Sequence, residues 1–259
     1  MLLAFDVGNT NVVLGLYEGD KLLDFWRISS TSHRTADEYA MLCFNFFAHK
    51  GYDKAQIHYA IISSVVPNKT DTLSRMLKKY FDITPLIVGH GLKTGLSMRY
   101  ENPKELGADR VVNAVSAVHQ YGYPLIIIDF GTATTFCVVD QEGNYLGGAI
   151  TAGIGISMEA LFEKTAKLPK VSLQAPKKAI GRTTTTAMQS GLVYGYAGMV
   201  DKMVARLAEE IGENPKTIKV VATGGRAEEI CLHSDFVKVV DPFLTLSGLQ
   251  LIAQKNRSK

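Results

Sequence analysis

Two acidic turns of similar composition are the residues of this chain best suited to chemistry. One apolar run ends in Asp6-Val7-Gly8 and is followed by Asn9 and Thr10, and a second ends in Asp129-Phe130-Gly131 and is followed by Thr132. Glycine lets the backbone come close to a ligand, and successive N–H groups of a turn bind anions. A carboxylate at the strand end can hold a cation directly or through water. Each turn therefore predicts contacts to a phosphate group and its metal ion.

The segments that follow the two turns also repeat, and they would position the turns. Each acidic turn leads into a strand, a polar turn and a further strand. A repeat of this length is harder to obtain by chance than a repeated tripeptide, so we interpret it as two related halves facing a shared nucleotide cleft. The alternative, an ordinary strand-end turn, fits either turn alone better than the matching pair. Strands are predicted at residues 12–17 and 22–28 after the first turn, and at residues 135–140 and 145–150 after the second.

Helices alternate with the remaining strands. Thr35 and Glu38 have the spacing of a capping box that opens an amphipathic helix. Residues 89–107 form a predicted loop with four glycines, and loops of this length inside compact domains are often functional. The mixture predicts an α/β architecture of two similar lobes, residues 1–118 and 119–259, with mixed sheets flanked by helices. Predicted helices cover about residues 35–49, 68–80, 108–121, 158–167, 185–212 and 244–255, and further strands cover residues 58–66, 85–88, 219–223 and 237–240.

The bulk composition favours a folded cytoplasmic protein. The 259 residues are 46% hydrophobic and 20% charged, which predicts a buried core, and the formal charge is only +3. Basic residues are scattered, so we expect no nucleic-acid partner. No stretch approaches the roughly 18 apolar residues of a membrane span, and Asp6 interrupts the first apolar run, so we expect no signal peptide and no membrane partner. The separated Cys43, Cys137 and Cys231 predict reduced thiols in the core.

The repeated turns and strands resemble the nucleotide-binding fold shared by actin, sugar kinases and Hsp70 chaperones, an actin-like, ribonuclease H-like ATPase fold. Residues 220–225 support this resemblance, because they form a predicted strand running into a double glycine, which in that superfamily lies beside the adenosine. Within the superfamily the chain closely resembles the type III pantothenate kinases. The matching motifs span nearly the whole chain and are residues 6–10, 100–103, 107–110, 129–134, 147–148, 188–191 and 241–245.

The resemblance implies ATP-dependent phosphorylation of pantothenate to 4′-phosphopantothenate, the first step toward coenzyme A. It also implies a homodimer, Mg²⁺ bound with ATP, and a monovalent cation, either K⁺ or NH₄⁺. By the same resemblance Asp6 positions the divalent metal and Asp129 binds the monovalent cation. The residues it assigns to ATP are Asp6, Val7, Gly8, Asn9, Thr10, Asn11, Val12, Val13 and Thr132.

Asp109 is the predicted general base. Phosphoryl transfer requires an acceptor for the proton of the substrate hydroxyl, and Asp109 lies in the first turn of a predicted helix, where the dipole favours the ionised carboxylate. The alternative is a helix-capping Asp paired with Arg110, and the family resemblance favours the base. By resemblance the residues that contact substrate are Tyr100, Gly107, Ala108, Asp109, Arg110 and Thr184. Tyr100 is otherwise a packed loop aromatic, and Thr184 is otherwise a helix N-cap.

Gly191, Gly195 and Gly198 follow one face of the longest predicted helix, at i, i+4 and i+7. Their small size lets another backbone approach closely. The approaching segment is either another part of this chain or, as the family homodimer implies, a helix of a second subunit.

Two other functions compete with this kinase. One is a regulatory protein of the same family that binds nucleotide without catalysis, although a protein of that kind would not need the base Asp109. The other is a different enzyme of the superfamily, such as a sugar or acetate kinase or a phosphatase acting on polyphosphate or nucleotide. A structural role is less well supported, because neither a large charged tail nor a repeat array is present. The six histidines form no spaced cluster, and none is assigned to metal binding or catalysis.

Overall fold

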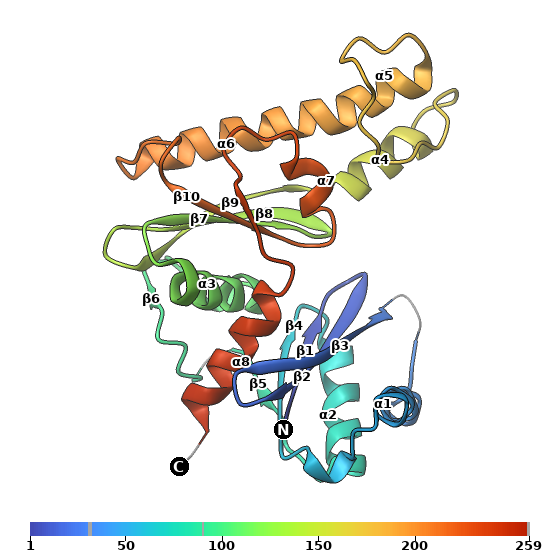
Figure 1. The fold of residues 1–259 in the computed structure, drawn as a ribbon, viewed down its shortest axis with the longest axis vertical. Coiled ribbons are helices and arrows are strands. Elements are labelled where there is room, and N and C mark those ends of the chain that lie inside the picture. The colour runs from blue at the N-terminus through green and yellow to red at the C-terminus, as the bar shows by residue number, and fades with distance from the viewer. Residues whose placement is uncertain (31–32, 90, 258–259) are drawn as a thin grey trace. The chain divides into compact units, whose positions relative to one another are not determined.

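The chain forms two compact units in the computed structural model, which describes residues 1–30, 33–89 and 91–257 (Figure 1). The first unit comprises Met1–Gly95, Asn102–Ser116 and Leu244–Lys259, and the second comprises Leu96–Glu101 and Ala117–Phe243. The division is therefore not the continuous one, at residues 118 and 119, that we expected from the sequence. Residue 90, in the predicted loop, and residues 258–259 lie outside the described ranges.

The first unit is built on a five-stranded sheet with the order β3-β2-β1-β4-β5. The first three strands form an antiparallel meander, and β4 and β5 extend the sheet parallel to β1. The strands are β1 (Leu2–Val7), β2 (Asn11–Glu18), β3 (Lys21–Ser29), β4 (Tyr59–Ser64) and β5 (Leu86–Ile87).

The second unit repeats this sheet. Its order is β11-β10-β7-β8-β9-β6, so that β9-β8-β7-β10-β11 corresponds strand for strand to the first sheet. The directions agree as well, because β7, β8 and β9 are antiparallel whereas β10 and β11 run parallel to β7. The duplication predicted from the two acidic turns is confirmed. The strands are β6 (Ser97–Met98), β7 (Leu125–Phe130), β8 (Ala133–Val139), β9 (Asn144–Ala152), β10 (Lys219–Thr223) and β11 (Val239–Val240).

The helices of the first unit begin where the sequence predicts. The Thr35 hydroxyl accepts from the Glu38 N–H at 3.3 Å, and the Glu38 carboxylate accepts from the Thr35 N–H at 2.7 Å, which completes the predicted capping box of α1. The described part of the loop predicted at residues 89–107 is largely irregular and contains β6 and the short 3₁₀ turn η2. The elements are α1 (Ala36–Lys50), η1 (Lys54–Gln56), α2 (Pro67–Phe81), η2 (Pro103–Glu105) and α3 (Ala108–Tyr121), which crosses into the second unit at Ala117.

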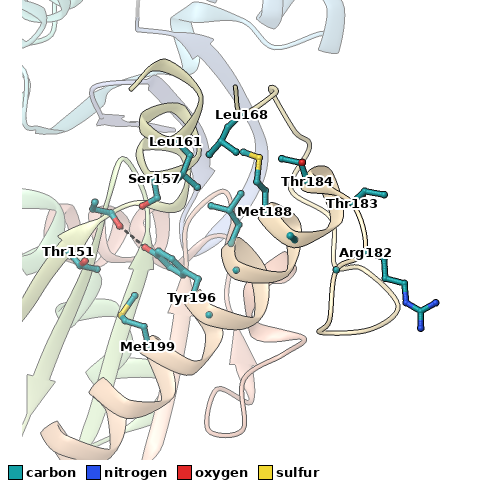
Figure 2. Close-up of a pocket in the computed structure, with 16 residues that line it drawn as sticks. Thr151, Ser157, Leu161, Leu168, Arg182, Thr183, Thr184, Met188, Tyr196 and Met199 are labelled. Carbon is teal, nitrogen blue, oxygen red and sulfur yellow. Dashed lines mark hydrogen bonds between the residues drawn. The ribbon is translucent and has the colours of Figure 1, made fainter. Parts of the chain in front are cut away.

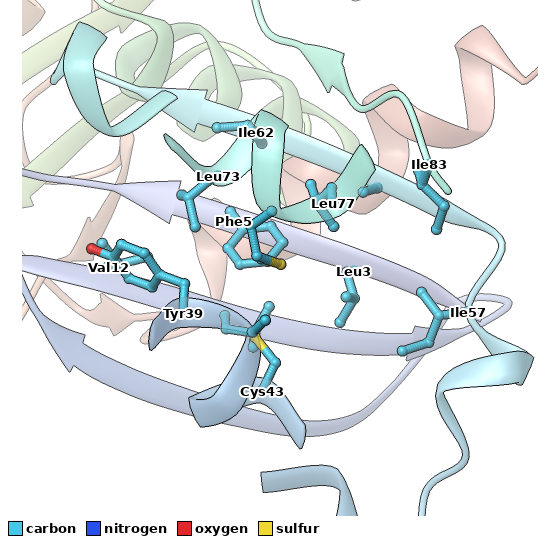
Figure 3. Packing of buried hydrophobic residues seen from close by; sticks show 14 of the residues in the cluster. Leu3, Phe5, Val12, Tyr39, Cys43, Ile57, Ile62, Leu73, Leu77 and Ile83 are labelled. Atoms are coloured by element: carbon cyan, nitrogen blue, oxygen red, sulfur yellow. The ribbon is translucent and has the colours of Figure 1, made fainter. Parts of the chain in front are cut away.

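One face of the first sheet packs against α1 and α2 and forms a hydrophobic core with them (Figure 3). Leu3, Phe5 and Val12 lie on this face, because side chains along a strand alternate between the two faces. Cys43 of α1 packs among them, and burial raises the pKa of its thiol to about 12. All three cysteines are buried, and none is in a disulfide, as the sequence predicted.

The opposite face of the first sheet is covered by α8 (Leu244–Asn256), which is why the end of the chain belongs to this unit. A Cβ atom at Gly15 would lie 3.1 Å from Leu246, and a Cβ at Gly248 would lie 2.8 Å from the Val112 side chain of α3. The turn between β2 and β3 is joined to the helix, since the Gln250 side chain donates to the Gly19 carbonyl at 3.1 Å. These contacts depend on residues far apart in the sequence.

The helices of the second unit pack on the β7 face that carries Ile126, Ile128 and Phe130. The long helix predicted at residues 185–212 is present as three consecutive helical segments, of which the middle one is a π-helix. The helix predicted at residues 158–167 begins earlier, directly after Gly153, and α7 was not predicted. The segments are α4 (Ile154–Glu163), α5 (Thr184–Ser190), the π-helical η3 (Gly191–Gly195), α6 (Tyr196–Glu210) and α7 (Ala227–Cys231).

Candidate active site

The first acidic turn joins β1 to β2 and is supported by the residue that follows β3. The Gly8 N–H donates to the Asn11 carbonyl at 2.9 Å, which closes the turn. Ser30 then makes two bonds of 2.8 Å, from its hydroxyl to the Gly8 carbonyl and from its N–H to the Thr10 carbonyl. Asn9 and Thr10 remain exposed. The turn is thus fixed at its base while its tip is accessible to a ligand.

The second acidic turn is supported in the same way. The N–H of Gly153, which follows β9, donates to the Thr132 carbonyl at 3.1 Å. A Cβ atom at Gly153 would lie only 2.5 Å from the Gly131 carbonyl oxygen, so the close approach requires glycine. Sequence reasoning missed the supporting roles of Ser30 and Gly153. Their signal was available, because each residue directly follows the third strand of its repeat.

Alternation along the first hairpin separates the predicted ATP contacts into two groups. Val7 and Val12 are buried in the core, so only their backbone groups can meet a ligand. Asp6 and its cross-strand partner Val13 lie on the opposite face, where they are half-buried. Asp6 therefore lies on the sheet face that α8 covers, the face to which Gly15 also belongs.

Asp129 occupies the corresponding place in the second sheet. Its neighbour on the parallel strand β10 is the buried Thr223, just as the neighbour of Asp6 on β4 is the buried Ser63. A Cβ atom at Gly224 would lie 2.7 Å from Oδ1 of Asp129, and Gly224 has a φ of +97°, so glycine is required there for two reasons. The double glycine noted in the sequence thus leaves room for the Asp129 carboxylate.

Asp109 lies in the first turn of α3, as predicted. Its Oδ1 atom accepts from the Arg110 backbone N–H at 2.8 Å, so the carboxylate does cap the helix. The capping partner is the backbone of Arg110. Asp109 remains half-buried, whereas Arg110 is only 7% exposed. Asp6, the first turn and residues 107–110 all belong to the first unit.

Tyr100 belongs to the second unit and packs as an aromatic residue. Its ring meets that of Tyr145 edge to face, with 6.2 Å between the ring centroids, and it also contacts Gly147. Packing therefore occupies one side of the ring, and the residue keeps partial exposure. Asp129, Thr132 and Thr184 belong to the second unit as well.

Thr184 lines a cavity of about 920 Å³ in the second unit (Figure 2). The N-cap of α5 is Thr183, whose hydroxyl accepts from the Thr186 N–H at 3.1 Å, so the alternative role suggested for Thr184 was wrong by one position. Thr184 is exposed, and its hydroxyl makes no hydrogen bond within the described part of the chain.

The cavity is bounded by α4, α5 and the π-helical turn. The Tyr196 hydroxyl donates to the Ala152 carbonyl of β9 at 2.8 Å (Figure 2), and it also shares a hydrogen bond of 2.7 Å with the Thr134 hydroxyl of β8. Single π-helical turns of this kind are often found at functional sites. The lining combines apolar side chains, such as Met188 and Leu161, with threonine hydroxyls and one arginine, Arg182. Such a mixture suits an organic ligand or an apolar protein segment.

Neither a preformed metal cluster nor a membrane span is found among the described residues. Within residues 1–30, 33–89 and 91–257 no three His, Cys, Asp or Glu side chains form a metal-binding group. His90, which we also assigned to no metal, lies outside these ranges. In the same part of the chain, no helix has both the length and the apolar character needed to span a bilayer.

The family model of the type III pantothenate kinases matches residues 2–206 of this chain. The chain belongs to the type III pantothenate kinase family. The matched region contains both acidic turns and all the residues assigned to substrate. The protein is accordingly a kinase by family.

Solved structures of related fold cover nearly all of the chain. A protein assigned to the Baf family of transcriptional activators from Campylobacter jejuni is 17% identical, with a TM-score of 0.57 over 98% of each chain. Component A of (R)-2-hydroxyglutaryl-CoA dehydratase from Acidaminococcus fermentans is 14% identical, with a TM-score of 0.52 over 97% of this chain and 95% of that one. A protein assigned as an N-acetylglucosamine kinase from Porphyromonas gingivalis is 13% identical, with a TM-score of 0.50 over 99% of each chain. The chain has the actin-like, sugar-kinase fold predicted from its repeat.

Membership of a kinase family implies ATP, with Mg²⁺, as the phosphate donor. The first turn has suitable chemistry, since Asp6, Asn9 and Thr10 offer a carboxylate, an amide and a hydroxyl beside backbone N–H groups. Mg²⁺ is usually held by one or two carboxylates together with substrate phosphates, and it keeps several waters. A single half-buried Asp6 therefore fits a metal that arrives with its nucleotide, without a cluster of acidic residues.

Proposed function

We propose that this member of the family phosphorylates pantothenate, transferring the γ-phosphoryl group of ATP to the primary hydroxyl and releasing 4′-phosphopantothenate and ADP. This reaction is the first step toward coenzyme A. The observation that carries the proposal is the family match, which includes Asp109 and the acidic turns in their predicted elements.

Asp109 is the proposed general base. The substrate oxygen forms a bond to the γ-phosphorus, the bond to the ADP oxygen breaks, and the hydroxyl proton passes to the Asp109 carboxylate. The position of Asp109 at a helix N-terminus supports this role, because the dipole stabilises the anion. Arg110 is proposed to bind either the carboxylate of pantothenate or a phosphate oxygen, since planar guanidinium groups commonly bind both. Tyr100 and Thr184 are proposed to complete the substrate contacts.

The two acidic turns are proposed to hold the phosphates and the cations. Asp6 and residues 7–13 would contact ATP, with Asp6 near the divalent ion, which supplies charge neutralisation at the phosphates when it is bound. Thr132 would contact ATP, and Asp129 would bind the monovalent cation, K⁺ or NH₄⁺. Ser30 and Gly153 support the two turns at equivalent places, which favours phosphate contact by both turns.

The proposal is tested by incubating the purified protein with ATP, Mg²⁺ and pantothenate and measuring phosphopantothenate by mass spectrometry. Parallel reactions contain K⁺, NH₄⁺ or Na⁺, and others replace pantothenate with N-acetylglucosamine, acetate or polyphosphate. We expect product only with pantothenate, and more of it with K⁺ or NH₄⁺. Product from another acceptor would reassign the substrate, and no product under any cation would favour a nucleotide-binding regulator.

A homodimer through α5, η3 and α6 is part of the proposal. Outside its own helix, a Cβ atom at Gly191, Gly195 or Gly198 would meet none of the described residues within 4 Å, and all three glycines are exposed. The first of the two explanations from the sequence, packing within the chain, is therefore wrong. On the neighbouring α4, Ile156 is 44% exposed and Phe162 is 45% exposed. An open glycine face beside exposed apolar side chains favours a second copy of this chain as the occupant.

Gly198→Glu is expected to separate the dimer, because it places a charge on the glycine face at a helical position where the monomer has space. Light scattering coupled to size exclusion should give twice the chain mass of 28.3 kDa for the wild type and one chain mass for the variant. Asn68→Glu, an exposed change on α2, is the matched control and should remain dimeric. A monomeric wild type, or a dimeric Gly198→Glu variant, would contradict this assignment.

A further inference from the structure

Gly107 occupies the N-cap position of α3. Its carbonyl accepts from the N–H groups of Arg110, at 3.1 Å, and Val111, at 3.3 Å, which are the first bonds of the helix. At this position helices favour Ser, Thr, Asp or Asn, whose side chain accepts an N–H group of the first turn. Glycine offers no such acceptor. The Arg110 N–H, which also bonds to the Gly107 carbonyl, donates to Oδ1 of Asp109 at 2.8 Å, so the Asp109 side chain performs the capping that the side chain of an N-cap residue usually performs.

The Asp109 carboxylate also occupies the space that a side chain at position 107 would need. A Cβ atom there would lie 2.5 Å from Asp109 Oδ1 and 3.6 Å from its Cγ, and apart from the adjoining residues 106 and 108 no other atom of the described chain would lie within 4 Å. The backbone of Gly107 is outside the left-handed region, so alanine is compatible with its conformation. The group that must move upon substitution is therefore the carboxylate of Asp109, and the main chain can stay in place.

We propose that Gly107 is a positioning residue for Asp109. The absence of a side chain at 107 leaves the carboxylate in the orientation held by the Arg110 N–H, and any side chain there turns it away. This inference rests on the proposed role of Asp109 as general base. It gives Gly107 a role beyond contact with substrate, because the glycine acts through Asp109 even when no substrate is bound.

Gly107→Ala is expected to lower kcat about 10²-fold, the effect of misplacing a catalytic group by about 1 Å. The dissociation constants of ATP and pantothenate should change less than about threefold, since a redirected base affects the reaction more than binding. Gly107→Ser should lose kcat similarly and retain its melting temperature, because serine can cap the helix itself. Gly89→Ala is the matched control, since a Cβ atom at Gly89 would meet none of the described residues beyond its chain neighbours within 4 Å.

A double-mutant cycle separates this role from direct contact with substrate. In an Asp109→Ala background the carboxylate is gone, so Gly107→Ala should have almost no further effect on residual turnover. If Gly107 acts only by touching pantothenate, the change will instead reduce affinity or rate equally in both backgrounds, and the inference is overturned.

A second readout does not depend on activity. The Arg110 amide resonance should follow the ionisation of Asp109 in a pH titration, because its N–H donates to that carboxylate. In Gly107→Ala protein this titration should be lost or much reduced. An Arg110 amide that titrates as in the wild type would overturn the inference. The measurement can be made even if pantothenate is not the substrate, so failure of the proposed function is distinguishable from failure of this inference.

Discussion

Asp109→Asn is expected to reduce turnover of pantothenate by about 10²–10⁴-fold, the usual contribution of a general base. Asparagine has nearly the same shape and can still accept the Arg110 N–H bond, so α3 should keep its capped start. What is lost is the negative charge that receives the proton. ATP binding should be largely unchanged, because the ATP contacts are assigned to the acidic turns.

Steady-state phosphopantothenate formation, together with calorimetric titration of ATP, tests this expectation. Asp71→Asn is a suitable control, since Asp71 is an exposed acid on α2 of the same unit. Unchanged turnover in Asp109→Asn protein would remove Asp109 from the mechanism. A parallel loss of ATP affinity would instead place its effect in nucleotide binding or in the fold.

Gly148→Ala is expected to destabilise the second unit by about 2–6 kcal/mol, through overpacking and backbone strain together. Gly148 lies in β9 with a φ of +154°, at the edge of the region that favours glycine. A Cβ atom there would overlap the carbonyl oxygen of Phe136 and lie 2.7 Å from its carbonyl carbon and 3.1 Å from the Cys137 Cα atom. Because these are backbone atoms of β8, no side-chain rotation can relieve the overlap.

Thermal unfolding monitored by circular dichroism should show the midpoint lowered by roughly 10 °C. Gly155→Ala provides the contrast, because Gly155 is helical and a Cβ there would meet no part of the described chain outside its own helix within 4 Å. That variant should unfold at the wild-type temperature or slightly above it, since alanine favours helix. Equal midpoints for Gly148→Ala and wild type would show that β8 and β9 can separate at little cost.

Two residues of the family motifs, Gly148 and Asp241, make contacts that stabilise the fold. Residues 147–148 are part of the resemblance to the pantothenate kinases, yet the structure gives Gly148 a packing role between two strands. Asp241, in another such motif, accepts from the Tyr121 hydroxyl at 3.1 Å and from the Phe243 N–H at 2.9 Å, and so stabilises a turn. A residue of a family motif can therefore have a structural role in the fold.

The sequence by itself determined the local elements and their duplication. The limits of α3 and the capping box of α1 followed from neighbouring residues, because capping bonds and side-chain periods act within one or two turns. The two acidic turns predicted two equivalent sheets for the same reason, since each meander is formed by consecutive strands.

Only the tertiary structure decided which segments come together. It placed α8 on the first sheet, against Gly15, and showed that a Cβ atom at Gly191, Gly195 or Gly198 would meet no other part of the described chain within 4 Å. It also showed that a Cβ at Gly107 would lie where the Asp109 carboxylate is held. Such outcomes depend on the shapes of packed side chains and on the exact path of the backbone, which no pattern of residue types along the chain encodes.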